Sequence, residues 1–149
     1  MFRRTATLAL LLGTAGLLAA CADSMQSSAQ APITLRATLS SAQEVPPNPS
    51  TGTGTATMTF NQASRQLTWN VTYGGLTGPA TMAHFHGPAT PGANAGVLVP
   101  IGGAGMTSPA AGSATLNDAQ AADLLAGRMY VNIHTAAHPG GEIRGQVTR

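Results

Sequence analysis

Two histidines separated by one residue, within the segment Met82-Ala83-His84-Phe85-His86-Gly87, are the residues of this chain best suited to chemistry. Successive side chains of a β-strand point to opposite faces, so an extended segment places His84 and His86 on one face together with Met82. Such a pair can bring two imidazole nitrogens within about 6 to 7 Å of each other. Imidazole is the commonest protein ligand of borderline transition metals, and a thioether adds the softness that suits copper. The segment therefore predicts part of a metal site, although two histidines on a solvent-exposed face would show the same pattern.

A third candidate ligand, His134, lies in the segment 129–134 near the end of the chain. The apolar residues Val131 and Ile133 alternate with polar ones, so His134 is expected on the face opposite the core. If this strand lies beside the histidine strand, three imidazoles gather at one place. Three imidazoles meet by chance much less often than two, so His134 strengthens the prediction of a metal site.

Other polar residues could complete such a site. Glu142 is expected on the same face of the last strand, so a carboxylate would join the three imidazoles on one polar patch. Glu142 and Arg144 could instead form a surface charge pair, worth less than about 1 kcal/mol. Glu44 or Glu142 could act as a base beside a metal, and His138 could reach the patch from the turn before Pro139.

The segments that must position these groups have the period of a β-strand. Apolar and polar side chains alternate through 33–40, 55–60 and 67–73, with threonine common on the outward face. Turn signals rich in glycine, proline and asparagine separate about seven such strands. The pattern predicts an all-β fold, either an antiparallel β-sandwich or a flattened Greek-key barrel, with one short helix.

The helix is expected between Asn117 and Gly127. Asn117 or Asp118 can cap its first turn, alanines and leucines follow, and Gly127 suits the left-handed conformation that ends helices. The stretch 102–112 before it is rich in glycine and small residues, which favours a flexible connection.

The first residues predict export. Arg3 and Arg4 precede an apolar run, 8–18, that is too short to span a bilayer comfortably. Small residues then lead to Cys21, the single cysteine of the chain, and this arrangement resembles a bacterial lipoprotein signal. We therefore expect a signal peptide at 1–20 and a lipid on Cys21, with plain secretion as the alternative.

The chain after the signal divides into a tether and one domain. Residues 21–32 are rich in serine, glutamine and alanine, which predicts a flexible tether, and 33–149 are enough for one domain with its own core. Asp23 stands two places after Cys21, not directly after it, so the usual inner-membrane retention signal is absent. The expected location is the cell envelope on the periplasmic side, anchored by lipid to the outer membrane.

Charge and motifs exclude several classes of function. The seven arginines include two in the expected signal, so five basic residues face five acidic ones in the remainder, and the chain has no lysine. Such a balance leaves no basic patch for nucleic acid. The sequence also lacks a Gly-x-Ser-x-Gly elbow, a phosphate-binding loop and a dinucleotide fingerprint. Catalysis is therefore less favoured than metal binding or protein interaction.

Several motifs carry a family resemblance: ATLSSAQEVPP at 37–47, AHFHGPA at 83–89, AGRMYVNIHT at 126–135 and PGGEIRGQV at 139–147. In this order they resemble the CHRD domain, named for its repeats in chordin, over about Ile33 to Val147. The resemblance implies a β-sandwich and a location outside the cytoplasm, and it implies little about activity. His84, His86 and His134 match histidines typical of the family's motifs. His138 departs from them, because asparagine is commoner before Pro-Gly-Gly.

Two functions follow from the sequence. The first is an exported lipoprotein that binds a transition metal through His84, His86 and His134, with copper favoured over zinc because of Met82 and the compartment. The alternative is a non-catalytic protein-interaction or structural module of the cell envelope. In that case the histidines would brace the sheet, and the sequence does not identify the protein partner.

Overall fold

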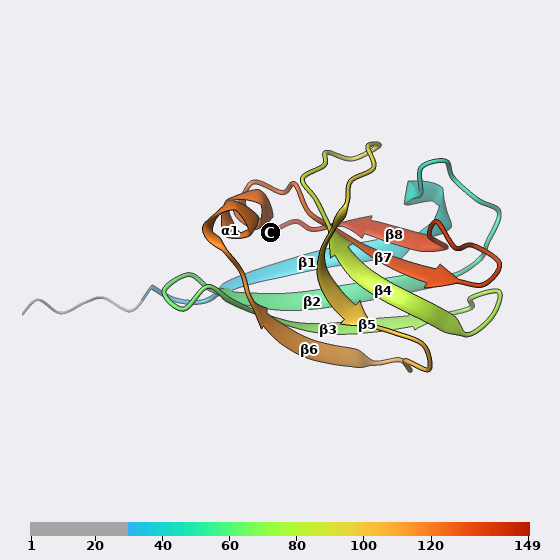
Figure 1. Ribbon diagram of the computed structural model, residues 1–149, viewed down its shortest axis with the longest axis horizontal. Coiled ribbons are helices and arrows are strands. Elements are labelled where there is room, and N and C mark those ends of the chain that lie inside the picture. Colours follow the sequence, from blue (N-terminus) through green and yellow to red (C-terminus); the bar gives the residue numbers. More distant parts are fainter. Residues whose placement is uncertain (1–29) are drawn as a thin grey trace, which may run out of the picture.

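The computed structural model describes residues 30–149 (Figure 1). The predicted signal peptide, Cys21 and most of the tether lie outside the described residues. The elements in chain order are β1 (Ile33–Ser40), the 3-10 helix η1 (Ser41–Gln43), β2 (Thr53–Asn61), β3 (Gln66–Gly74), β4 (Ala80–His86), β5 (Val97–Gly102), β6 (Ala110–Thr115), α1 (Asp118–Leu125), β7 (Tyr130–Thr135) and β8 (Ile143–Gln146). The predicted all-β class with one short helix is confirmed.

The first three strands follow directly from the alternating pattern. Leu35 and Leu39 of β1, Phe60 of β2 and Leu67 of β3 are each at most 1% exposed, whereas most of the residues between the apolar positions of these strands lie on the outer surface. The three strands pair antiparallel along almost their whole length. Each apolar position therefore meets apolar partners across the sheet, and burial of this face supplies the main stabilisation of the fold.

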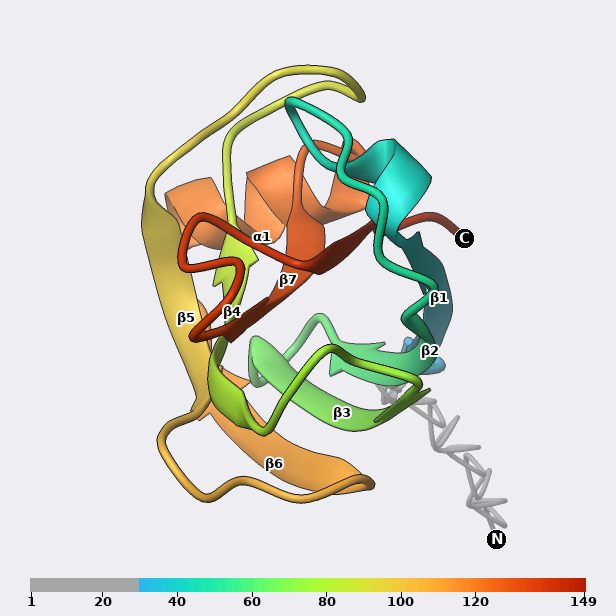
Figure 2. The same cartoon turned by 90° about the vertical axis from the view of Figure 1, so that its right-hand side faces the viewer.

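All eight strands belong to one antiparallel sheet with the order β5-β4-β7-β8-β1-β2-β3-β6. The sheet curls so that its two end strands, β5 and β6, approach each other (Figure 2). Of the two arrangements expected from the sequence, the nearly closed barrel is therefore the one observed. The join between β8 and β1 is short, with Ser40 opposite Arg144 and a single bridge between Arg36 and Thr148.

The strand β6 was not expected, because its residues fall partly in the stretch predicted to be a flexible connection. The sequence AAGSAT contains one β-branched residue and no aromatic residue, so its intrinsic strand preference is weak. Pairing with β3 holds it in place, with Gly112 directly opposite Trp69. A Cβ at Gly112 would lie 2.7 Å from the indole, so the missing side chain is what lets β6 cover Trp69.

The helix α1 forms where the sequence predicts it. The Asn117 side chain accepts a hydrogen bond from the Gln120 backbone N–H at 2.9 Å, and the Gln120 side chain accepts one from the Asn117 N–H at 3.0 Å. This capping box satisfies two backbone donors at the start of the helix. Gly127 follows the helix with φ of +70°, and Leu124 packs into the core. Within residues 30–149, no helix is long and apolar enough to cross a membrane.

Candidate metal centre

The histidine strand β4 lies directly beside β7, so the condition under which the three imidazoles gather is met. Met82 is opposite His134, and His84 is opposite Asn132, while the alternate positions of both strands face the core. Residues directly opposite in a sheet share a face, so the histidines of both strands project from the same side. An irregularity between Ala80 and Met82 sets this register, because it shifts the strand by one residue before the histidines.

The face that carries the histidines is not the wet surface expected from the sequence. Asn132 and Tyr130 are each 3% exposed, and His134 is 6% exposed. Two connections cover this part of the barrel, the β4–β5 loop (87–96) and the segment between β1 and β2 (41–52), which run close together in Figure 2. Asn94 of the first loop donates a hydrogen bond to the Val45 carbonyl of the second at 2.9 Å. The alternation of polar residues correctly placed the face, but the loops that bury it have no periodic signal.

The three histidines form a compact cluster. One nitrogen of each ring can be chosen so that all three lie within 4.8 Å of one another. The closest pair is His84 Nδ1 and His134 Nε2, which are 3.3 Å apart. His86 is 9% exposed and His84 is partly buried, so access from solvent is greatest on the His84 side. Three nitrogens at these separations could hold a metal ion.

Hydrogen bonds to backbone carbonyls define the protonation of two of the rings. His86 Nδ1 lies 3.0 Å from the Ala95 carbonyl oxygen, and His134 Nδ1 lies 3.0 Å from the Pro139 carbonyl oxygen. A carbonyl only accepts, so both Nδ1 atoms carry the proton, and in the neutral ring each Nε2 presents a lone pair. Metal-binding histidines commonly use this arrangement, in which one nitrogen is anchored and the other is free.

One of these lone pairs has no partner. His86 Nε2 is buried and makes no hydrogen bond within the described residues. A buried acceptor without a partner costs about 1–3 kcal/mol, so a neutral ring in this position needs a compensating interaction. Coordination of a metal ion would supply one.

Burial also keeps the histidines uncharged. Loss of solvent lowers the pKa of His84, His86 and His134 below the usual value of 6.5, because the charged ring is the form that loses more by burial. Hydrogen bonds to carbonyls oppose this shift at His86 and His134, and the neighbouring imidazoles add to it. Neutral imidazole is the form that binds metals, so the cluster is ready for a metal at neutral pH.

A stack of planar groups supports the cluster from behind. The Tyr130 ring lies parallel to the His86 ring, with centroids 4.9 Å apart. The Arg144 guanidinium lies over the Tyr130 ring, 3.5 Å from its centroid. Arg144 also donates to Ala93 and Asn94 of the covering loop, at 2.6 and 3.0 Å. The stack therefore fixes the plane of His86 and ties the loop to β8.

Glu142 does not join the patch, contrary to the expectation from the sequence. Its carboxylate accepts hydrogen bonds from Ser50, Thr77 and Thr135, and the residue is fully buried. Burial alone would raise its pKa, but these hydrogen bonds outweigh that effect and lower the pKa. Glu142 precedes β8 instead of lying within it, so strand alternation does not apply to its side chain. Nor does Glu142 form a salt bridge with Arg144 among the described residues.

The sequence offered no reason to place Glu44 beside Asn132. The Asn132 amide donates to both carboxylate oxygens of Glu44, at 2.9 and 3.1 Å, and both residues are buried. Burial raises the Glu44 pKa to about 7, and nearby Arg144 partly opposes that rise. The irregular segment after β1 carries Glu44 there, and such a long-range contact leaves no local mark in the sequence.

A family comparison agrees with this architecture. The model of the CHRD domain matches residues 35–147, which is most of the chain. The protein belongs to the CHRD domain family. No curated protein and no solved structure matches the chain significantly.

Two further residues of this CHRD domain were candidates for the site. His138 lies in the β7–β8 connection, where its backbone N–H donates to Thr135, and its ring is not part of the three-histidine cluster. Met82 is 42% exposed and lies opposite His134, at the edge of the cluster. The structure thus brings together His84, His86 and His134 and leaves His138 apart.

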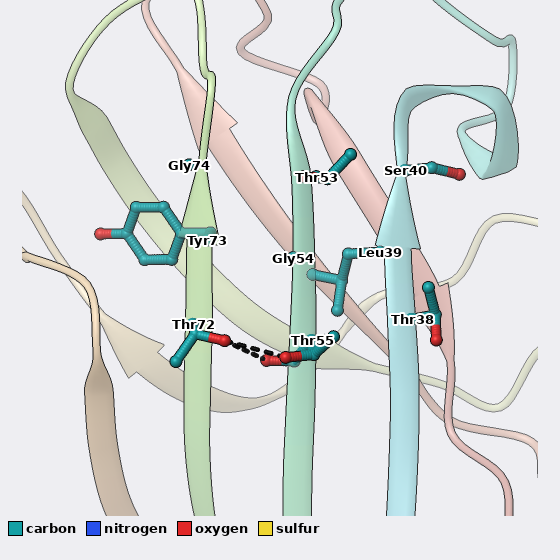
Figure 3. Close-up of a pocket in the computed structure, with 9 residues that line it drawn as sticks. All are labelled: Thr38, Leu39, Ser40, Thr53, Gly54, Thr55, Thr72, Tyr73 and Gly74. Atoms are coloured by element: carbon teal, nitrogen blue, oxygen red, sulfur yellow. Dashed lines mark hydrogen bonds between the residues drawn. The ribbon is translucent and has the colours of Figure 1, made fainter.

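A separate hollow of about 440 Å³ lies against β1, β2 and β3 of the CHRD domain (Figure 3). The hydroxyls of Thr55 and Thr72 hydrogen-bond there at 2.8 Å. None of its lining residues is charged, and none is a histidine or cysteine. The polar groups of the hollow are only hydroxyl and backbone groups, beside the apolar surfaces of Leu39 and Tyr73, so the histidine cluster has the more distinctive chemistry.

Proposed function

We propose that this CHRD domain binds one transition metal ion through His84, His86 and His134. The observation that carries the proposal is the buried Nε2 of His86. The hydrogen bond from Nδ1 to Ala95 leaves a lone pair on this nitrogen, which has no partner among residues 30–149. A merely structural histidine would be expected to use both ring nitrogens.

The spacing of the nitrogens supports the proposal. Two ligands bound to a tetrahedral metal at about 2.0 Å are about 3.3 Å apart. The separation between His84 Nδ1 and His134 Nε2 is 3.3 Å, and that pair needs little movement to share an ion. In the metal-bound form, His84 would move its proton to Nε2 so that Nδ1 can bind. Three protein ligands leave one position for a further ligand.

Copper is favoured over zinc. Imidazole suits both metals, so the preference comes from Met82, which is on the histidine face opposite His134. We further propose that the protein is an exported lipoprotein with the site on the periplasmic side of the envelope, a location in which copper is available. The support for export is the sequence from Arg3 to Cys21.

Metal titration tests the binding proposal. The full chain, purified in detergent and stripped with a chelator, is titrated with Cu(II) and with Zn(II) in competition with a coloured chelator. We expect one tight equivalent, and a loss of affinity of about tenfold or more in each of His84→Ala, His86→Ala and His134→Ala. His138→Ala is the matched control, because this histidine is outside the cluster.

A triple variant of the three histidines that binds as strongly as the wild type would refute the proposal. Fluorescence of the single tryptophan, Trp69, verifies that each variant is folded. Metal should also raise the melting temperature of the wild type alone, since a ligand at one hundred times its dissociation constant adds about 2.7 kcal/mol.

Metabolic labelling tests the lipid anchor. A palmitate analogue should label the wild type, and Cys21→Ala should abolish labelling and release the protein from membranes. Labelling that persists in the Cys21→Ala variant would refute lipidation at this residue.

A further inference from the structure

We propose that the site binds copper as Cu(I), with the thioether of Met82 as a fourth, exchangeable ligand at its solvent-facing edge. This inference rests on the proposed function, because it requires the three histidines to be metal ligands. It adds the oxidation state of the ion and a role for Met82.

The charge of the site favours a monovalent ion. Among the described residues, the cluster contains three imidazoles, which burial disfavours in their charged form, and no carboxylate. Neither nearby acidic residue belongs to the cluster: Glu142 accepts hydrogen bonds from three hydroxyl-bearing residues, and Glu44 accepts them from Asn132 beside the histidines. A divalent ion in a partly buried site gains from anionic ligands, and this site provides none.

A fixed positive charge lies behind the cluster. Arg144 stacks on Tyr130, which in turn stacks on the His86 ring. Arg144 is 2% exposed and forms no salt bridge among residues 30–149. Glu44 interacts with its charge, but with a pKa of about 7 Glu44 neutralises only part of it at neutral pH. The repulsion between this charge and a bound ion is twice as large for a divalent ion as for a monovalent one, so Arg144 shifts the preference towards Cu(I).

Met82 is placed to complete the coordination. Its Cα is paired with that of His134, and directly opposite residues of a sheet have Cβ atoms about 4.5–5.5 Å apart. It also precedes His84 by two residues, so it shares a face with both members of the closest nitrogen pair. A flexible thioether can span this distance, and thioethers select Cu(I) over divalent ions.

The exposure of Met82 places it where a metal ion from solvent would first meet the site. His86 and His134 are 9% and 6% exposed. Met82 is 42% exposed, and among residues 30–149 only Val97 is also a large hydrophobic residue with this much exposure. Packing therefore does not explain a methionine here. A soft ligand at the rim would accept Cu(I) from outside and pass it to the imidazoles behind.

A comparison of two metals in two methionine variants tests the inference. The full chain in detergent is titrated anaerobically with Cu(I) against bicinchoninate, and separately with Zn(II) against a zinc chelator. Met82→Leu keeps the volume and removes the sulfur. Met106→Leu is the matched control, because Met106 packs against the core near Gly102, away from the histidine face.

We expect Met82→Leu to weaken Cu(I) binding by about tenfold or more and to leave Zn(II) binding unchanged, while Met106→Leu changes neither. Equal Cu(I) affinity in the wild type and Met82→Leu would overturn the role of Met82. A wild type that binds Cu(II) or Zn(II) more tightly than Cu(I) would overturn the choice of ion while the proposed function stands. Failure to bind any of these metals would overturn both.

Discussion

Replacement of Glu44 by glutamine should make the domain more stable above neutral pH and remove part of the dependence of stability on pH. Glu44 is 6% exposed, and burial raises its pKa from 4.5 to about 7. Because the folded state binds the proton more tightly than the unfolded state, the wild type loses stability as pH rises from about 4.5 to 7. Glutamine keeps the shape and can still hydrogen-bond with Asn132, but it carries no charge to desolvate.

The magnitude follows from the two pKa values. Each tenfold change in acidity is worth about 1.4 kcal/mol, so a rise from 4.5 to about 7 corresponds to about 3 kcal/mol as a ceiling. The pKa of about 7 already includes the opposing effect of Arg144, and relaxation and water penetration around the buried carboxylate reduce the ceiling to about 1–2 kcal/mol. Glu44→Gln should therefore gain about 1–2 kcal/mol over the wild type at pH 8 relative to their difference at pH 4.5.

Urea unfolding at a series of pH values measures this difference. The chelator-treated proteins are unfolded at pH 4.5, 5.5, 6.5 and 8 and followed by Trp69 fluorescence. Glu142→Gln is the control: hydrogen bonds lower the Glu142 pKa below 4.5, so its stabilisation is lost only towards more acidic pH, and its difference from the wild type should stay nearly constant from pH 5.5 to 8. A constant difference between Glu44→Gln and the wild type across this range would refute the assigned cost of burying the Glu44 carboxylate.

Two further substitutions test the core and the helix. Phe85→Ala should lower the free energy of unfolding by about 3–5 kcal/mol, because Phe85 is fully buried and its ring meets that of Trp69 edge-on, with centroids 5.3 Å apart. Urea unfolding measures the cost, and a value below about 1 kcal/mol would contradict the prediction. Asn117→Ala should cost about 1 kcal/mol by loss of the capping box of α1, and Asn117→Asp, which restores an acceptor, should recover most of it in the same assay.

Much of the fold follows from local patterns in the sequence. Period-two alternation predicted β1, β2 and β3 with the correct faces inward, because each of these strands has one buried and one solvated side. β6 shows the limit of such reasoning. Its residues have little strand preference. The strand is held by pairing with β3, where Gly112, which has no side chain, leaves room for the Trp69 indole directly opposite.

The candidate site divides in the same way. Alternation placed His84, His86 and His134 on one side of the sheet, and the neighbouring strands β4 and β7 then brought them together. The burial of the site, the anchoring of His86 by Ala95 and the contact of Glu44 with Asn132 depend on irregular loops. Residues in such loops obey no repeat, so their long-range contacts cannot be derived from spacing.

An anomalous diffraction map from crystals grown with one equivalent of copper shows where the ion binds. If the three histidines hold the metal, one strong peak lies about 2.0–2.1 Å from a nitrogen of each of His84, His86 and His134. A map with no peak among these three rings, while copper occupies another position such as His138, would contradict the assignment of the cluster as the metal site.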